Sequence, residues 1–187
     1  MGMWLFLFTE MLLFGGMFIL YAVYRFKHPE EFHTSAQDLD TTIGAINTLI
    51  LLTSSLTMAL SILALQKGKK RLSLVFQVLT ILMGAAFLGN KSLEWGAKFH
   101  HGMYPNSAYL LTKSSGEILF YGLYFVMTGI HGLHVLIGIG VLLFMVLFTM
   151  RGSIDSTNFV KLENSGLYWH FVDIVWVYLF PLFYLIT

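Results

Sequence analysis

The chain contains no cysteine, only three prolines and very little charge. Without cysteine it has no disulfide, no thiolate-bound metal and no thiol catalysis. Charged residues make up 11% of its 187 residues, whereas a soluble domain carries roughly 25%. Because 57% of the residues are hydrophobic, the composition argues against a soluble monomer and excludes a disordered chain. With a net charge of +1, there is no basic field that could hold nucleic acid.

Five long apolar stretches lie between the few charges that are present. A helix needs about 20 apolar residues to cross the hydrocarbon core of a bilayer, and each stretch reaches or approaches that length. In lipid the backbone must satisfy its own hydrogen bonds, so we expect each stretch to form a helix. Residues 25–40 and the other segments between the helices are expected to be short connections. The sequence therefore predicts an all-α integral membrane bundle, a single membrane domain over 1–187 with five transmembrane helices at about 2–25, 40–66, 72–97, 117–150 and 162–187.

The distribution of lysine and arginine indicates how these helices are oriented. Six of these residues lie in segments on the same side as the N-terminus, and four lie on the opposite side. The six include the dense basic turn QKGKKR at 66–71. Since cytoplasmic segments carry an excess of lysine and arginine, we expect the N-terminus in the cytoplasm and the C-terminus on the periplasmic or external side.

Two of the apolar stretches contain carboxylates at depths where ionisable groups are costly. Glu10 lies near the middle of the first stretch, and two interpretations are open for it. It is either a hydrogen-bonded carboxyl between helices or a group that handles protons or contacts lipid. Lys91 and Glu94 lie three residues apart on one helix face, so we expect them to form an ion pair near the membrane interface.

The last two stretches contain histidines and further carboxylates. His131 and His134 lie three residues apart, and His170 could oppose either of them across a haem or metal. The glycines around the first two histidines favour close helix packing instead. We expect a buried polar seam between helices, with no catalytic, cofactor-binding or metal-binding residue in this chain. The residues predicted for the seam are Glu94, His131, Glu163, His170 and Asp173.

Five stretches of the sequence, in the same order, closely resemble subunit III of the haem–copper terminal oxidases (the cytochrome c oxidase subunit 3 family). The two histidine motifs are TGIHGLHVLIG at 128–138 and GLYWHFVDIVW at 166–176. The others are MWLFLFTEMLLFGGMF at 3–18, INTLILLTSS at 46–55, and Glu94 followed by Trp95. The resemblance covers nearly the whole chain and implies a short, five-helix form of bacterial type, whose first helix matches the third of the seven-helix members.

The resemblance implies a non-catalytic subunit of a proton-pumping aerobic oxidase that reduces O2 to water in a bacterial cytoplasmic (inner) membrane. Haem and copper are expected in its partners, which would be the catalytic subunit I, the copper-bearing subunit II, a subunit IV and a larger respiratory supercomplex. In the family, subunit III supports proton uptake and protects the complex during turnover. Glu10 matches the family's carbodiimide-reactive carboxylate. Glu10 and His134 fall where the family lines a lipid-filled cleft, so we expect a bound phospholipid there or between this chain and its partner.

Several alternatives to this function stay open. The same fold serves quinol oxidases, and a related subunit accompanies nitric oxide reductase. These residues do not distinguish the electron donor, because the donor binds other subunits. A further hypothesis, from another functional class, is an independent membrane haem protein that binds haem through His131 or His134 together with His170. A transporter or channel is disfavoured, because the sequence has neither repeat symmetry nor a pair of helices broken by glycine and proline.

Overall fold

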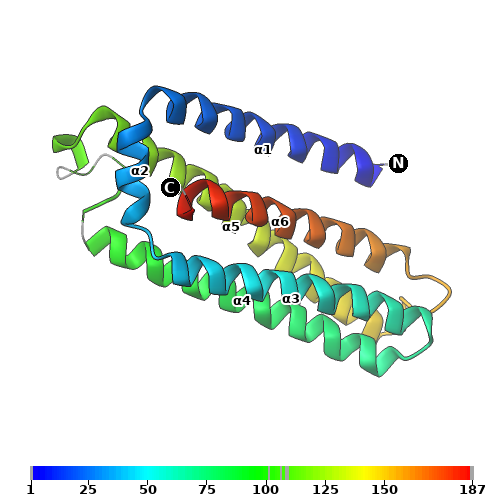
Figure 1. Cartoon of the computed structure of the whole chain (residues 1–187). Coiled ribbons are helices and arrows are strands. Elements are labelled where there is room, and N and C mark those ends of the chain that lie inside the picture. The colour runs from blue at the N-terminus through cyan, green and yellow to red at the C-terminus, as the bar shows by residue number, and fades with distance from the viewer. Residues whose placement is uncertain (1, 101, 106, 108–109, 186–187) are drawn as a thin grey trace. The chain divides into compact units, whose positions relative to one another are not determined.

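A computed structural model of the chain describes residues 2–100, 102–105, 107 and 110–185. Within these residues, α-helices and one short 3₁₀-helix are joined by short connections, and no strand occurs (Figure 1). The prediction of an all-α fold is therefore confirmed. The elements are α1 (Gly2–Lys27), α2 (Pro29–Gln37), α3 (Thr41–Gln66), α4 (Lys70–His100), η1 (Leu110–Thr112), α5 (Ser115–Met150) and α6 (Val160–Tyr184).

Five of the helices are long and apolar enough to cross a membrane, namely α1, α3, α4, α5 and α6. Their bounds agree with the expected spans to within a few residues at each end. The longest is α5, with 36 residues. At a rise of about 1.5 Å per residue it exceeds a hydrocarbon core of about 30 Å, so it extends beyond that core or tilts within it.

The short helix α2 lies in the segment 25–40, which the sequence predicted to be a connection. Pro29 occupies its first turn, where a missing backbone N–H costs nothing, and Glu30 and Glu31 follow in the same turn, where negative charge is favoured. Its buried face consists of Phe32 and Ala36, four residues apart, and Ser35. Figure 1 shows α2 turning away from the axis of α1. Two apolar positions are too few to produce a helical pattern that is visible in the sequence.

The chain divides into two compact units, each assembled from separate segments of sequence. The four helices α3 to α6 each contribute residues to both units, so neither unit is one continuous stretch. The single membrane domain expected from the sequence stays a prediction. Unit 1 comprises Met1–Ala45, Asn90–His131 and Val175–Thr187, and unit 2 comprises Ile46–Gly89 and Gly132–Ile174.

Aromatic rings form the core of unit 1. Tyr21 of α1 packs on Phe32 of α2 and on Phe183 of α6, with ring centroids 5.5 and 5.0 Å apart. Phe120 of α5 completes a closed circuit, 5.4 Å from Phe32 and 5.7 Å from Phe183. All four contacts are edge-to-face, the arrangement that aromatic quadrupoles favour. The Tyr21 hydroxyl also donates a hydrogen bond to the carbonyl of Leu182, so the end of α1 is attached to the end of α6.

A single tryptophan dominates the core of unit 2. Trp169 of α6 is fully buried, and its indole N–H donates to Ser54 Oγ at 3.0 Å. The ring lies directly against two glycines, Gly84 of α4 and Gly138 of α5. A Cβ added at these glycines would lie 2.6 and 3.0 Å from ring atoms of Trp169. A side chain at position 84 would therefore force the indole to move, and one at position 138 would make the contact with the ring tighter than usual.

The connection from α5 to α6 is organised by one carboxylate. Asp155 Oδ1 accepts hydrogen bonds from the hydroxyl and backbone N–H of Thr157 and from the backbone N–H of Asn158, at 2.7 to 2.9 Å. These hydrogen bonds, those from Thr157 first, lower the pKa of Asp155 below its ordinary value because they favour the charged form. The turn that they close leads directly into α6.

Candidate functional site

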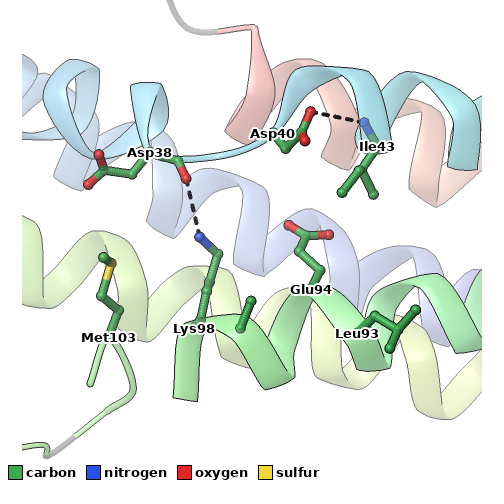
Figure 2. Close-up of a pocket in the computed structure, with 8 residues that line it drawn as sticks. Asp38, Asp40, Ile43, Leu93, Glu94, Lys98 and Met103 are labelled. Carbon is green, nitrogen blue, oxygen red and sulfur yellow. Dashed lines mark hydrogen bonds between the residues drawn. The ribbon is translucent and has the colours of Figure 1, made fainter. Parts of the chain in front are cut away.

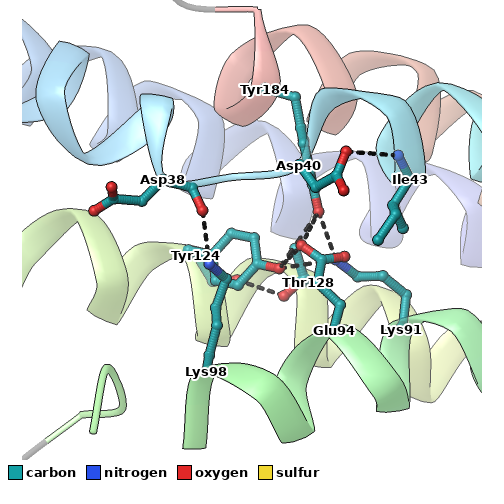
Figure 3. Close-up of polar contacts among 9 residues, drawn as sticks. All are labelled: Asp38, Asp40, Ile43, Lys91, Glu94, Lys98, Tyr124, Thr128 and Tyr184. Atoms are coloured by element: carbon teal, nitrogen blue, oxygen red, sulfur yellow. Dashed lines mark hydrogen bonds and ion pairs between the residues drawn. The ribbon is translucent and has the colours of Figure 1, made fainter. Parts of the chain in front are cut away.

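Unit 1 contains a buried group of four side chains that we call the ion-pair cluster: Lys91 and Glu94 of α4, Tyr124 of α5 and Tyr184 of α6 (Figure 3). The Lys91 ammonium donates to Glu94 Oε2 at 3.0 Å, to the Tyr124 hydroxyl at 3.0 Å and to the Tyr184 hydroxyl at 2.8 Å. Both tyrosine hydroxyls donate to Glu94 Oε1 at 2.6 Å. The four side chains thus connect three helices through one hydrogen-bonded network.

Burial makes this network different from a surface ion pair. Lys91 and Glu94 are only 7% and 8% exposed. Taking two charges out of water costs several kcal/mol each, and attraction offsets this only when further hydrogen bonds satisfy both groups. The tyrosines supply those bonds, and the Lys91 ammonium also lies 5.1 Å from the centre of the Trp176 ring. The pair that the sequence predicted is present and is enclosed by side chains of the protein. Its expected position near the membrane interface stays a prediction.

A pocket of about 460 Å³ lies beside the cluster in unit 1 (Figure 2). Its polar lining comes from Asp38, Asp40, Glu94 and Lys98. The Lys98 ammonium donates to the backbone carbonyl of Asp38 at 3.5 Å, and Asp38 Oδ2 accepts from the Tyr121 hydroxyl at 3.0 Å. Asp40 Oδ1 accepts the backbone N–H groups of Thr42 and Ile43 at 2.9 and 3.2 Å, which makes Asp40 the N-cap of α3.

Two other residues predicted for the site also lie in unit 1. Glu10 is half-buried on α1. His131 of α5 is fully buried, and its ring lies 5.3 Å from the ring of Trp176. His131 and Glu94 are therefore both buried in the interior of unit 1, and their membership of one polar seam stays a prediction.

The remaining predicted residues lie in unit 2. His134 is half-buried, and its carbonyl accepts a hydrogen bond from the Tyr168 hydroxyl at 3.1 Å. His170 is also half-buried, with Nδ1 2.5 Å from Ser55 Oγ. Asp173 is buried, and the Ser55 hydroxyl lies beside its carboxyl group. Among the described residues, no partner reaches either Asp173 carboxyl oxygen with the geometry of a hydrogen bond. His170 and Asp173 therefore share Ser55 as a neighbour.

Glu163 does not belong to the buried set, so that part of the prediction is wrong. It is exposed in the first turn of α6. A negative side chain there interacts favourably with the free N–H groups at the start of the helix. The seven-residue spacing places Glu163 and His170 on the same face of α6. That face is half-buried at His170 but exposed at Glu163, in the first turn of the helix.

Four residues of the cluster and the pocket were not predicted from the sequence: Tyr121, Tyr124, Tyr184 and Lys98. Tyrosine near the end of a membrane span usually indicates the interfacial aromatic belt, so its hydrogen-bonding role was not visible. Lysine at the end of α4 has the ordinary interpretation of a side chain that reaches the headgroup region. The available signal was the Lys91–Glu94 spacing itself, because a charged pair inside a span requires donors and acceptors from other helices.

The described part of the chain has no group of three histidine, aspartate or glutamate side chains placed to hold a metal ion. What the observed arrangement can do is hold helices together and offer a pocket with polar and apolar walls. Figure 3 shows the cluster and the polar side of the pocket next to each other, with Glu94 belonging to both.

Comparison with known proteins gives a consistent result over the full length. The family model for cytochrome c oxidase subunit III matches residues 1–187. The chain is 33% identical to cytochrome c oxidase subunit 3 of Thermostichus vulcanus, over 100% of this chain and 87% of that protein. It is 30% identical to a probable quinol oxidase subunit 3 of Staphylococcus saprophyticus, over 100% and 88%. It is 31% identical to the cytochrome bo(3) ubiquinol oxidase subunit 3 of Pseudomonas aeruginosa, over 98% and 83%.

Proposed function

The chain belongs to the cytochrome c oxidase subunit III family, and from this premise we propose that it serves as the accessory subunit of an aerobic, proton-pumping terminal oxidase. The family match over the whole chain, together with five membrane-spanning helices, makes it a multi-pass membrane subunit III of a haem–copper oxidase. In this proposal the chain packs against a catalytic subunit I and a copper-bearing subunit II, which hold the haem and copper. A subunit IV and a respiratory supercomplex are further proposed partners. The observation that carries the proposal is the full-length family match.

The electron donor is the first point to test. We propose cytochrome c as the donor, and quinol is the alternative, because similar proteins carry both names. The complex that copurifies with this chain should oxidise reduced cytochrome c and consume O2. Oxidation of quinol without cytochrome c would support the alternative, and reduction of nitric oxide in place of O2 would contradict both oxidase proposals.

Glu10 and His134 are the proposed lipid- or proton-coupling residues. Replacing Glu10 with Gln should leave the haem spectrum of the complex unchanged, since we propose no cofactor contact for it. The number of turnovers before inactivation, or the rate of proton delivery, should fall. Unchanged pumping and unchanged lifetime would instead indicate that Glu10 has a packing role.

We also propose that the N-terminus lies in the bacterial cytoplasm and the C-terminus on the external side of the inner membrane. Because the chain has no cysteine, single cysteines can be introduced and labelled cleanly. With a membrane-impermeant maleimide, Lys113→Cys should react in intact cells. Lys67→Cys, in the basic turn, should react only after permeabilisation. The opposite pattern would contradict the orientation.

The alternative of an independent haem protein has its own test. The isolated chain should show no haem absorption of its own after purification away from partner subunits. A stoichiometric Soret band from the pure chain that is lost on His170→Ala would favour the alternative and contradict an accessory role.

A further inference from the structure

Lys98 places a buried positive charge in the pocket of unit 1, and its ammonium has more N–H donors than hydrogen bonds. The side chain is only 8% exposed, and an ammonium has three N–H donors. In the described residues its one hydrogen bond goes to the Asp38 carbonyl at 3.5 Å, the outer limit for such a bond. The Tyr121 and Tyr124 rings, with centroids at 5.8 and 5.7 Å, add attraction but accept no conventional hydrogen bond. A nearly enclosed cation that lines an open cavity therefore has room for an anionic oxygen.

The same pocket has acidic groups at its exposed edge. Asp38 and Asp40 are both exposed, and each uses one carboxylate oxygen, for the Tyr121 hydroxyl and for the cap of α3. The other oxygen of each accepts no hydrogen bond from the described residues. Glu94 contributes little to this edge, because its two oxygens already accept three hydrogen bonds within the ion-pair cluster. The pocket thus offers a donor inside and acceptors at its rim.

Apolar side chains form the remaining wall of the pocket: Ile43, Leu93, Ala97 and Met103. The site lies at helix ends, since Asp40 immediately precedes α3 and Lys98 lies in the last turn of α4. Membrane-spanning helices leave the hydrocarbon at their ends, so this position is where polar headgroups meet acyl chains. A volume of about 460 Å³ falls within the range of small-molecule sites, roughly 300–1,000 Å³.

We propose that this pocket binds the headgroup of a zwitterionic aminophospholipid. The phosphate accepts hydrogen bonds from Lys98, the primary ammonium donates to Asp38 and Asp40, and the upper acyl chain lies against the apolar wall. An anionic headgroup without an amine would face two aspartates with no compensating charge. A trimethylammonium headgroup carries positive charge but has no N–H to donate. Neither Glu10 nor His134, the residues of the other proposed lipid contact, is among the residues that line this pocket.

Lipid selectivity of the full-length chain tests the proposal directly. The chain is delipidated in detergent and placed in bilayers that contain equal amounts of phosphatidylethanolamine, phosphatidylcholine and phosphatidylglycerol. The lipid that stays bound is then identified by native mass spectrometry. Phosphatidylethanolamine should be retained about tenfold over the other two, the size expected from one charge-assisted hydrogen bond. Equal retention of all three, or preference for phosphatidylglycerol, would overturn the proposal even without a variant.

Variants locate the selectivity in this pocket. Lys98→Met should abolish the preference, whereas Lys27→Met, the same change at an exposed lysine at the end of α1, should keep it. The pair Asp38→Asn and Asp40→Asn should lose discrimination against phosphatidylglycerol, while asparagine preserves the cap of α3. Full selectivity in all of these variants would place the lipid elsewhere.

A soluble competitor separates a lipid from a free zwitterion of the same headgroup chemistry. Glycerophosphoethanolamine, which has no acyl chains, should fail to displace the lipid at equal concentration, because it leaves the apolar wall uncovered. Displacement at equal concentration would show that the acyl chain contributes nothing, and it would overturn the assignment to a phospholipid.

Discussion

The interiors of the two units use different kinds of polar group. Unit 1 buries a full ion pair, Lys91 and Glu94, within a network completed by two tyrosine hydroxyls. Unit 2 relies mainly on neutral pairs. Thr57 and Thr80 hydroxyls lie 2.8 Å apart, and Ser61 and Ser73 hydroxyls lie 3.1 Å apart.

The difference shows what each kind of group requires of its surroundings. A hydroxyl in a helix can donate a hydrogen bond to the backbone carbonyl one turn earlier, as the Thr80 hydroxyl does to Phe76 at 2.9 Å. A buried charge has no such local substitute, so it is stable only where several donors or acceptors converge. Glu94 accepts three hydrogen bonds for this reason. Damage to unit 1 should therefore be large and non-additive, and damage to the polar pairs of unit 2 should be small.

The largest effect is expected at the ion-pair cluster. Glu94→Gln leaves the Lys91 ammonium buried without its counter-charge, which should lower the free energy of unfolding by about 3–5 kcal/mol. Thermal or denaturant unfolding of the detergent-solubilised chain measures this loss. The matched control is the double variant Lys91→Met with Glu94→Gln, which removes both charges and should recover much of the lost stability. A double variant whose loss equals the sum of the two single losses would show that the charges are not coupled.

The next largest effect is expected at the close packing of Trp169 in unit 2. There, added side-chain volume should reduce stability more than the loss of a hydroxyl hydrogen bond does. Gly84→Ala places a Cβ 2.6 Å from the Trp169 ring, so the indole must move, at a cost of about 1–3 kcal/mol. Gly89→Ala is the control on the same helix and in the same unit, because a Cβ there meets nothing within 4 Å. Thermal or denaturant unfolding of the two variants under identical conditions measures the difference. Equal behaviour of the two alanine variants would contradict the close packing.

A smaller effect is expected where unit 1 begins α3. Asp40→Ala removes the acceptor for the backbone N–H groups of Thr42 and Ile43, a loss of about 1 kcal/mol. Asp40→Asn should retain nearly all of the stability, since asparagine caps helices as well as aspartate does. Unfolding midpoints of the two variants under identical conditions make the comparison. If both lose the same stability, the charge of Asp40 matters rather than its cap.

The smallest effect is expected in the hydroxyl pairs of unit 2. Thr57→Val keeps the branched shape and removes one interhelical hydrogen bond, which is worth about 0.6 kcal/mol in a membrane protein. A double-mutant cycle with Thr80→Val isolates the pair term. A coupling energy as large as that of the Lys91–Glu94 pair would remove the distinction drawn between the two units.

The sequence predicted the membrane-spanning elements well, because hydrophobic length is a local property of the chain. The spans around α3 and α5 were expected at 40–66 and 117–150 and occur at Thr41–Gln66 and Ser115–Met150. The short helix α2 was missed, because its buried face consists of Phe32, Ala36 and one serine rather than a repeating apolar pattern. Spacing also predicted the Lys91–Glu94 contact, since residues three apart in a helix are neighbours.

The environment of these charges could not be predicted in the same way. Glu94 obtains its other hydrogen bonds from Tyr124 and Tyr184, which lie 30 and 90 residues further along the chain. Nothing in the local sequence distinguishes these two tyrosines from Tyr178, which lies on α6 together with Tyr184 but is exposed. The exposed position of Glu163 shows the same limit, because a helix face predicted from spacing does not reveal where the protein interior ends.

The sequence by itself determined that this is an all-helical membrane chain, where its five spans lie and which family it resembles, because hydropathy and short motifs are read from neighbouring residues. Only the tertiary structure decided which polar groups meet. It buried the Lys91–Glu94 pair, gave it two tyrosine hydroxyls, and left Lys98 facing a pocket with two aspartates at its rim. The physical reason is that a charge in a membrane protein is stabilised by partners from other helices, and those partners are chosen by packing.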